Sequence, residues 1–403
     1  MIKEGTIPEN ANIEQISFLG LAKQNLRKLS MFIMLGLILL VFAVLTNGVN
    51  LTPRNITNIF IQNSYILILA VGMVLVIIIG NIDLSVGSVV AFSGALSAML
   101  YNTGIGLIPT LLLSLLIGAA IGVFQGFWIA FVGIPAFITT LAGMLFFRGL
   151  TYIITNVSPI SLRDDGFKKI ASGSLNIPGF TIGSMDGLSI VVMVIAVVLV
   201  VFFTLHRRRK EISNGFSVLP LRYTILKVAS LSALIIFVFL RFAAYRGIPT
   251  VGLVLFIVTA IFVFLTNNTV IGRYIYAVGG NAKSAKLSGI NSEQVVFITH
   301  IIMGVLCGLS GVVFTAYMNS ALPQAGNQFE MDAIASCYIG GAAASGGIGT
   351  IIGAITGGLV MGVINNGMSL MNIGADWQYV VKASILLLAV FYDIWSRRKS
   401  GLG

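Results

Sequence analysis

The sequence predicts an all-α membrane protein that crosses the bilayer many times. Its 403 residues are 57% apolar and only 9% charged, whereas about 25% of the residues in a soluble domain are charged. The mean hydropathy is +1.00. A membrane-spanning helix needs about 20 apolar residues, so the apolar residues could supply roughly eleven such helices. This composition excludes a soluble enzyme, a disordered chain and a nucleic-acid-binding domain.

The excess of positive charge fits a membrane protein better than a protein that binds a polyanion. The chain has 24 Lys and Arg residues against 13 Asp and Glu residues, a formal net charge of +11. Cationic residues collect in the cytoplasmic loops of membrane proteins, and no basic stretch here is interleaved with stacking aromatic residues. The two cysteines and two histidines lack the spacing of metal ligands, so we expect neither a metal site nor a disulfide framework.

Twelve apolar segments separated by turn residues account for the predicted crossings. The first, at 29–46, follows a polar segment and lacks the small-residue cleavage site of a signal peptide, so it is predicted to remain as a helix. Two others, 86–101 and 331–346, are too short to span about 30 Å of hydrocarbon unaided. We therefore predict 10–12 transmembrane or re-entrant helices, the remaining segments being 61–80, 107–131, 134–155, 187–205, 224–242, 248–265, 294–316, 348–371 and 376–395.

The distribution of charge orients these segments. If the amino terminus is cytoplasmic and each segment crosses the membrane in turn, then 206–223, 266–293 and the tail are also cytoplasmic. Sixteen of the 24 Lys and Arg residues then lie on that side. The opposite orientation would contradict the positive-inside rule, so both termini are predicted to be cytoplasmic. The longest predicted external loop is then a connector or a docking surface for an external partner. The predicted parts are a cytoplasmic segment 1–29, a transmembrane domain 30–396, a cytoplasmic tail 397–403 and the external loop 156–186.

A break in the apolar pattern occurs at residues 79–88, Ile-Gly-Asn-Ile-Asp-Leu-Ser-Val-Gly-Ser. Asp83 is costly at membrane depth unless it faces protein or a water-filled cavity. The flanking glycines favour non-helical backbone, which membranes tolerate only where it is buried or lines a cavity. Asp83 and Ser85 could cap the following helix, line a solute pathway, or do both.

A second break, Ile-Gly-Gly-Ala-Ala-Ala-Ser-Gly-Gly, occupies residues 339–347. Broken helices at corresponding places in two halves of a chain are typical of transporters built from internal repeats. Close packing of helices explains the small residues equally well, so an internal repeat stays one of two interpretations. With Gly80 placed on Gly340, the matches are Ile79 with Ile339, Ser85 with Ser345 and Gly87 with Gly347.

The predicted cytoplasmic loop 266–293 has turn signals on both sides of a short helical pattern at 282–287. A compact helix there could receive a push from a soluble partner, although an ordinary connector has the same pattern. The sequence Gly279-Gly-Asn-Ala-Lys-Ser lacks the glycine that precedes lysine in a phosphate-binding loop. No catalytic constellation is visible, so energy for transport must come from an ion gradient or another polypeptide.

Five short blocks of sequence carry a family resemblance. They are Gly-x-Ile-Asp-Leu-Ser-Val-Gly-Ser at 80–88, Thr-Leu-Ala-Gly-Met-Leu-x-x-Arg-Gly at 140–149, Tyr-Ala-Val-Gly-Gly-Asn with Ala-Lys-Leu-Ser-Gly-Ile at 276–290, Met-Asp-Ala-Ile-Ala with Ile-Gly-Gly at 331–341, and Asn-Asn-Gly-Met-Ser-Leu-Met with Trp-Gln-Tyr-Val-Val-Lys at 365–382. Together they resemble the permease subunits of bacterial ABC importers for monosaccharides, of the ribose, galactose and xylose type. The extra stretch 187–242 resembles the longer xylose and multiple-sugar branch. Asn81 and Ala342 depart mildly from the family pattern.

The resemblance implies a transport subunit, not an enzyme, that moves a monosaccharide across the bacterial inner membrane by alternating access. A pentose such as xylose is the favoured substrate. Two permease chains, expected to be identical, would form the pathway, and a periplasmic or extracellular sugar-binding protein would deliver the sugar. The chain itself would hold no cofactor, because ATP and Mg²⁺ would bind the cytoplasmic ATPase subunits. These would grip a coupling loop that contains Gly279, Gly280, Asn281, Lys283, Lys286, Leu287 and Gly289.

Sugars are recognised by amides and carboxylates that pair with hydroxyl groups and by aromatic faces. On that basis the predicted pathway residues are Asn81, Asp83, Ser85, Gln125, Tyr338, Asn365, Asn366 and Gln378, with Gln62, Asn63, Tyr65 and Tyr379 as further candidates. Trp128 and Trp377 are better explained as anchors at the membrane interface. Arg148 and Lys382 are expected to be paired or to extend toward the interface. We expect Asp83→Asn to impair transport more than assembly.

Two other classes of function stay open from the sequence. An ion-coupled secondary transporter would use Asp83 as its coupling group, and its uptake would survive loss of any ATPase but collapse with the ion gradient. An intramembrane enzyme would need a catalytic constellation that the sequence does not show. Within the importer class, the alternative substrate is a branched-chain amino acid or other small nutrient, although charge-matching groups are scarce along the apolar segments.

Overall fold

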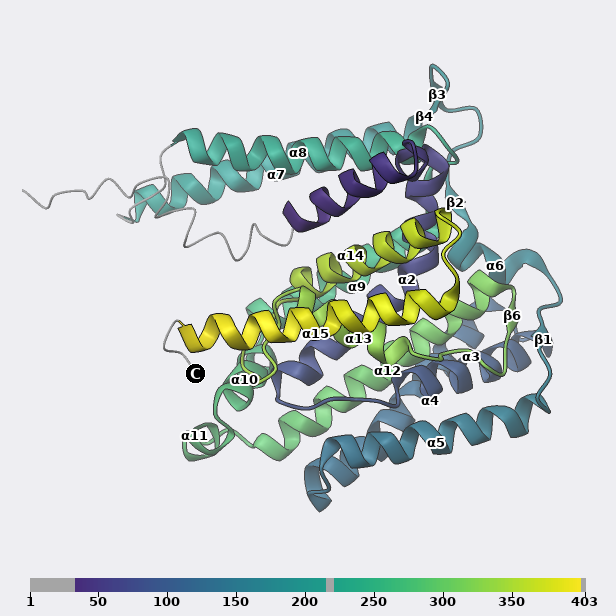
Figure 1. Cartoon of the computed structure of the whole chain (residues 1–403), viewed down its shortest axis with the longest axis vertical. Helices are drawn as coiled ribbons and strands as arrows, with labels where there is room; N and C mark the ends of the chain where they lie inside the picture. Colours follow the sequence, from purple (N-terminus) through teal and green to yellow (C-terminus); the bar gives the residue numbers. More distant parts are fainter. Residues whose placement is uncertain (1–32, 215–220, 400–403) are drawn as a thin grey trace, which may run out of the picture.

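The computed structural model describes residues 33–214 and 221–399, which form one bundle of helices (Figure 1). This confirms the predicted all-α class, because the described strands are only two residues long. They form three antiparallel pairs: β1 (Ile160–Ser161) with β6 (Ser320–Ala321), β2 (Ser174–Leu175) with β5 (Ile248–Pro249), and β3 (Thr181–Ile182) with β4 (Met185–Asp186). The helices are Ile33–Leu45, η1 (Val49–Leu51), α2 (Pro53–Ile78), α3 (Val86–Asn102), α4 (Leu107–Phe127), η2 (Trp128–Val132), α5 (Ala136–Thr155), α6 (Asp165–Ser172), α7 (Gly187–Ser213), α8 (Leu221–Ala243), α9 (Thr250–Asn268), α10 (Val270–Gly280), α11 (Ala282–Leu287), α12 (Ser292–Met318), α13 (Phe329–Ile339), α14 (Ile351–Leu370) and α15 (Ala375–Lys399).

Eight of the described helices are long and apolar enough to cross a membrane, and the chain is a multi-pass membrane protein. They are α2, α4 together with η2, α5, α7, α8, α9, α12 and α14. Two shorter apolar helices, Ile33–Leu45 and α3, add to these. With α13 and α15, a helix occupies each of the twelve apolar segments in the sequence. The bounds differ most at the start of α2, which begins at Pro53 rather than at 61, and at the end of α7, which ends at Ser213 rather than at 205.

The described ends of the chain lie at the same end of the bundle. In Figure 1 the start of the first helix, α11 and the end of α15 all lie toward the left, whereas β1, β2 and β6 lie toward the right. This arrangement agrees with an even number of crossings, which would place both ends of the chain on the same side of the membrane, as predicted. Helix α15 continues through 397–399, so the predicted tail begins as part of that helix, while 1–29 lies outside the described residues.

Helix α2 forms the centre of the bundle and packs against α12, α13 and α14. It buries 83% of its apolar stretch, whereas α7 and α8 bury only 6% each and form a peripheral hairpin. Helices α4 and α12 approach most closely at Gly118 and Gly304, where a Cβ on either glycine would meet the carbonyl oxygen of the other. Small residues allow this backbone contact, the usual means of packing helices where no hydrophobic effect holds them together.

Both predicted breaks are present, and their helices end in the same way. Helix α2 stops at Ile78, where the Asn81 N–H donates to the Val76 carbonyl at 3.0 Å and Gly80 has φ of 84°. Helix α13 stops at Ile339, where the Ala342 N–H donates to the Cys337 carbonyl at 2.9 Å and Gly341 has φ of 82°. A glycine with positive φ is the usual terminator of such a helix. The structural match therefore pairs Gly80 with Gly341, one residue away from the superposition on Gly340.

The short segment at 331–346 crosses the bilayer only in combination with irregular backbone. Helix α13 has 11 residues, which at 1.5 Å per residue cover about half of a 30 Å hydrocarbon layer. It starts beside Tyr65, whose ring centroid is 4.6 Å from that of Phe329. The following segment reaches the end of α2, where the Gly347 N–H donates to the Ile78 carbonyl at 2.8 Å. The chain thus runs beside the second half of α2 to its end and returns as α14.

Widening the contact between α4 and α12 should destabilise the bundle. A valine at Gly304 would overlap the backbone of α4, and we expect the free energy of unfolding to fall by about 1–3 kcal/mol. The matched control is Gly149→Val on α5, where a Cβ meets no atom within 4 Å. Thermal unfolding of the detergent-solubilised variants measures the difference, and equal midpoints would contradict the packing argument.

Candidate functional site

A cavity of about 790 Å³ lies between the first half of α2 and the segments around α13, α14 and α15. Its lining on α2 runs from Arg54 to Ile66 and includes the side chains near the helix start. Beyond Ile66, every residue of α2 from 67 to 78 is buried. The cavity is therefore closed toward the Ile78 end and lies in the half of the bundle that holds the start of α2.

The lining of the cavity is rich in amides and aromatic rings. Amides can donate to and accept from hydroxyl groups, and rings offer apolar faces, a combination that suits a neutral polyhydroxylated solute. At the closed end the Tyr65 ring packs against Phe314 and Phe329, with centroids 4.8 and 4.6 Å away. The amide residues are Asn55, Asn58, Gln62, Asn63, Asn327, Gln328, Asn365, Asn366 and Gln378.

Three of the predicted pathway residues line this cavity, and they differ in what their amides do. Asn366 exchanges two hydrogen bonds with Asn55, of 2.8 and 3.0 Å, and so ties α14 to α2. Gln378 donates to the Ile373 carbonyl at 2.9 Å. The Asn365 Oδ1 is buried without a hydrogen-bond partner among the described residues. The further candidates Gln62, Asn63, Tyr65 and Tyr379 also line the cavity.

Four other predicted pathway residues lie away from the cavity, in and beside the first break. Asp83 is 3% exposed, and its Oδ1 accepts from the Ser85 N–H at 2.8 Å and from the Ser85 hydroxyl at 2.6 Å. Gln125 on α4 donates to the Ser85 hydroxyl oxygen at 2.8 Å. This cluster closes the turn before α3 and fastens it to α4, while Asn81 is half-buried. A place for these residues on the pathway stays a prediction.

His300 on α12 completes this cluster, although the sequence suggested an isolated histidine. It is 1% exposed, interacts electrostatically with Asp83, and lies 2.9 Å through Nδ1 from the Val296 carbonyl. Its Nε2 has no hydrogen-bond partner among the described residues. No local pattern links Asp83 and His300, because helices distant in the chain bring them together.

Arg148 and Lys382 each have a polar partner, as expected. Arg148 donates through Nη1 to the Ala325 carbonyl at 2.5 Å, and Lys382 forms a 2.9 Å ion pair with Asp332. Tyr338 is half-buried on α13 and is not part of the cavity lining. The exposed fractions of Trp128 (37%) and Trp377 (63%) fit their interpretation as anchors.

The sequence reasoning missed Asn58, Asn327, Gln328 and Asp332 in the cavity lining. A signal existed for α2, because Asn55, Asn58 and Gln62 recur at helical spacing and share one face. That face was overlooked because polar residues were taken as the turn before a helix at 61. No sequence pattern predicts that residues 327–332 line the cavity, because their place there depends on how this segment packs inside the bundle.

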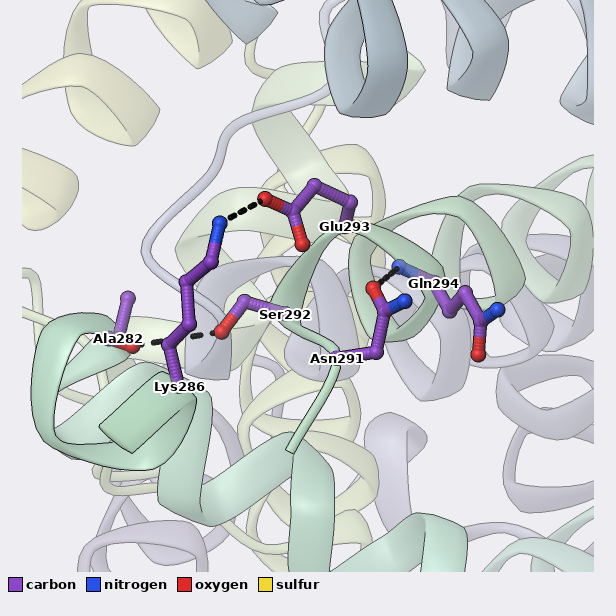
Figure 2. A network of polar contacts seen from close by, with 6 residues as sticks. All are labelled: Ala282, Lys286, Asn291, Ser292, Glu293 and Gln294. Carbon is purple, nitrogen blue, oxygen red and sulfur yellow. Dashed lines mark hydrogen bonds and ion pairs between the residues drawn. The ribbon is translucent and has the colours of Figure 1, made fainter. Parts of the chain in front are cut away.

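The predicted coupling loop folds as a compact unit at the end of the bundle that holds the described chain ends (Figure 1). Asn281 accepts through Oδ1 from the Ser284 N–H at 2.9 Å and so begins α11. Figure 2 shows Lys286 paired with Glu293 at 2.7 Å and the Ser292 hydroxyl donating to the Ala282 carbonyl at 3.3 Å. These contacts fasten α11 to the start of α12. Gly280, Lys283, Leu287 and Gly289 are exposed, and Leu287 is 90% exposed.

The coupling loop also touches both irregular segments. A Cβ on Gly279 would overlap the Ile78 carbonyl oxygen, the same oxygen that accepts from the Gly347 N–H. The Tyr276 hydroxyl donates to the Gly349 carbonyl at 2.8 Å. The end of α2, the second break and the coupling loop therefore meet at one junction of backbone atoms.

The predicted external loop 156–186 folds over the end of the bundle as α6 and short strand pairs. Phe167 and Ala171 of α6 are fully buried, which anchors the loop. Asp164 accepts from the Gly166 N–H and the Tyr101 hydroxyl, both at 2.6 Å. Stabilised chiefly by the Tyr101 hydroxyl, the carboxylate of Asp164 has a pKa below its usual range. Binding of an external partner to this loop stays a prediction.

Comparisons with known proteins give one consistent family. Residues 55–209 and 184–390 match a family described as "Branched-chain amino acid transport system / permease component". The chain is 37% identical over 377 residues to the xylose transport system permease protein XylH of Haemophilus influenzae, which covers 93% of this chain and 98% of that protein. It is 36% identical over 386 residues to XylH of Escherichia coli (95% of each). The identity to the ribose import permease protein RbsC of Escherichia coli is 33% over 362 residues, 89% of this chain and 92% of that protein. No solved structure matches the chain.

The turn at Asp83 should depend on an acceptor oxygen more than on a negative charge. Asp83→Ala leaves two buried Ser85 donors without their acceptor, and we expect the free energy of unfolding to fall by about 1–3 kcal/mol. Asp83→Asn keeps an oxygen in the same place and should unfold at nearly the wild-type temperature. Thermal unfolding of both variants tests this, and equal destabilisation would show that the charge holds the turn. Solute uptake by the folded Asp83→Asn variant then tests the expected loss of transport.

Proposed function

The chain belongs to the family of ABC-importer permease components that includes the xylose and ribose permeases, and we propose that it moves a neutral monosaccharide inward by alternating access. A pentose such as xylose is the proposed substrate. The chain is a multi-pass transport subunit rather than an enzyme, and such a component works with an ATPase and a substrate-binding partner. We further propose that two copies of the chain pair, that the ATPase subunit binds ATP and Mg²⁺, and that an external sugar-binding protein delivers the sugar.

The cavity carries this proposal. Its volume of about 790 Å³ falls within the range of about 300–1,000 Å³ that is usual for small-molecule sites. Nine amide side chains and the Tyr65–Phe329 ring pair offer hydroxyl partners and apolar faces together. The buried oxygen of Asn365 lacks a donor that a sugar hydroxyl would supply.

The position of the cavity supports an outward-facing state. It lies in the half of the bundle that holds the start of α2, which the charge distribution places outside. The fully buried stretch of α2 at 67–78 closes the path toward the cytoplasm. Inward release would require the irregular segments beside this stretch to move.

The coupling loop suggests how an ATPase could drive that movement. The 90% exposed Leu287 offers an apolar contact at the tip of α11. On the inner side of the same loop, Gly279 and Tyr276 touch the end of α2 and the second break. A displacement of α10 and α11 would therefore reach both irregular segments without an intermediate element.

Uptake of labelled xylose, ribose and galactose by cells that carry the complete importer tests the proposal. We expect uptake of at least one sugar to be lost when the ATPase subunit is deleted and to persist when an ionophore collapses the ion gradients while ATP is maintained. Uptake that survives deletion of the ATPase but collapses with the gradient would instead establish the secondary-transporter alternative. Labelled leucine in the same assay tests the amino-acid alternative, which the description of the matching family suggests.

Leu287 should matter for assembly with the ATPase. Leu287→Glu puts a charge at the apolar tip of α11, and we expect the yield of copurified ATPase subunit to fall at least about tenfold, because interface energy concentrates in a few apolar contacts. Val157→Glu is the control, since Val157 is 62% exposed in the predicted external loop. If the Leu287→Glu variant retains the ATPase subunit, the ATPase does not depend on Leu287 for its contact with this chain.

Tyr276 should matter for coupling rather than for assembly. Tyr276→Phe removes only the hydroxyl that donates to Gly349, so the ATPase should copurify at the wild-type yield. We expect sugar uptake per ATP hydrolysed to fall severalfold in proteoliposomes with the complete importer. Tyr274→Phe is the control, because Tyr274 is exposed on the same helix. An unchanged ratio would show that this hydrogen bond has no part in coupling.

A further inference from the structure

The ion pair between Asp332 and Lys382 lies in the wall of the cavity. Lys382 on α15 meets Asp332 on α13 at 2.9 Å between Nζ and Oδ2, and their side chains are only 19% and 12% exposed. Both residues line the cavity beside the amides. Asp332 lies next to Phe329 and interacts electrostatically with Tyr65, so it belongs to the closed end.

The carboxylate of Asp332 is only half satisfied by this pair. Its Oδ2 accepts from Lys382, whereas its Oδ1 is buried without a hydrogen-bond partner among the described residues. Buried carboxylate oxygens are rarely left without donors, because the lost hydration is costly. The end torsion of an aspartate is broad, so a small rotation about χ2 can present Oδ1 to a solute in the cavity.

A second acceptor in the same wall lacks a donor. The Asn365 Oδ1 on α14 is also buried without a partner among the described residues. The neighbouring Asn366 is fully engaged with Asn55, so among the buried side-chain acceptors of the described lining residues, those of Asn365 and Asp332 lack a donor. If the side chains of Asp332 and Asn365 turn toward the cavity, a solute with at least two hydroxyl hydrogens would satisfy both acceptors.

We propose that Asp332 is a specificity-determining residue of the pathway, whose carboxylate accepts a hydroxyl hydrogen of the transported sugar. Lys382 is a positioning residue that holds this carboxylate against α15 through the 2.9 Å ion pair. The inference rests on the proposed function and deepens it by naming the solute as a neutral polyol with two donor hydroxyls, one for Asp332 and one for Asn365.

The charges of the pair define what the site rejects. Lys382 is already engaged, and Arg54, the other cation of the lining, is exposed at the start of α2, so a carboxylate that reaches the closed end faces the second oxygen of Asp332. Like charges in a poorly hydrated site repel strongly. Sugar acids and amino acids, which carry a carboxylate, are therefore excluded, whereas a neutral pentose is accepted.

The test measures binding to the purified full-length permease in nanodiscs, without a binding protein that would impose its own selectivity. Equilibrium dialysis compares labelled xylose, ribose and galactose with labelled xylonate. We expect at least one neutral sugar to bind at least about tenfold more tightly than xylonate, a ratio that needs no variant and is independent of folding effects. Equal binding of xylose, ribose, galactose and xylonate, or no binding of any of them, would overturn the proposal.

The variants separate recognition from a purely structural tie between α13 and α15. Asp332→Asn should weaken binding of the preferred neutral sugar about tenfold or more and reduce its advantage over xylonate, as expected for a lost hydrogen bond to a charged group. Lys382→Arg keeps the ion pair and should bind within about twofold of wild type, whereas Lys382→Met should weaken binding. Thermal unfolding identifies any variant that fails to fold.

The matched control is Glu211→Gln, which breaks the exposed pair with Arg207 on the peripheral helix α7 and should leave binding unchanged. A folded Asp332→Asn variant with wild-type affinity and selectivity would show that the pair is structural. The two proposals fail separately: cells that take up no sugar through the ATPase contradict the proposed function, whereas normal uptake with no selectivity at the isolated permease contradicts only the role of Asp332.

Discussion

The hydrogen-bonding demand of the backbone inside a bilayer governs this structure. A chain in hydrocarbon must satisfy its N–H and C=O groups internally, so non-helical segments survive only inside the protein. The two breaks at 79–85 and 340–350 meet this demand by lying against the core, and the Gly347 N–H finds its acceptor in the Ile78 carbonyl. This single arrangement brings the end of α2, the second break and the coupling loop together. The cavity lies away from this junction, toward the start of α2.

The cavity combines fixed polar groups with unsatisfied ones, and the division has a physical meaning. Asn55 and Asn366 satisfy each other and fix the wall between α2 and α14. Asn365 and Asp332 each keep a buried oxygen without a donor. The hydrogen bonds of Asn55, Asn63, Asn366 and Gln378 hold this wall in place, and other polar groups of the wall stay available to a solute. At the closed end the charges of Asp332 and Lys382 offset each other, which suits a neutral sugar better than a charged nutrient, whereas Arg54 lies at the start of α2.

The apolar pattern predicted the helices well and the polar clusters poorly. Twelve apolar segments correspond to twelve helices, since the bilayer requires runs of apolar residues of a given length. The start of α2 was misplaced because Asn55 and Asn58 were taken as part of a polar turn, whereas they form one helix face with Gln62 that lines the cavity. The glycine match between the breaks was one residue out of register, because Gly340 and Gly341 are indistinguishable until their φ values are known.

The sequence alone determined that this chain crosses a membrane many times, where two helices break and which family its motifs resemble. These properties depend on composition, local length and local order, which a sequence displays directly. Only the tertiary structure decided that Asn365 and Asp332 share a cavity, that Asp83 and His300 share a different cluster, and that Gly279 touches Ile78. Such pairs are far apart in the chain and meet only because helix packing brings them together, so no local pattern could reveal them.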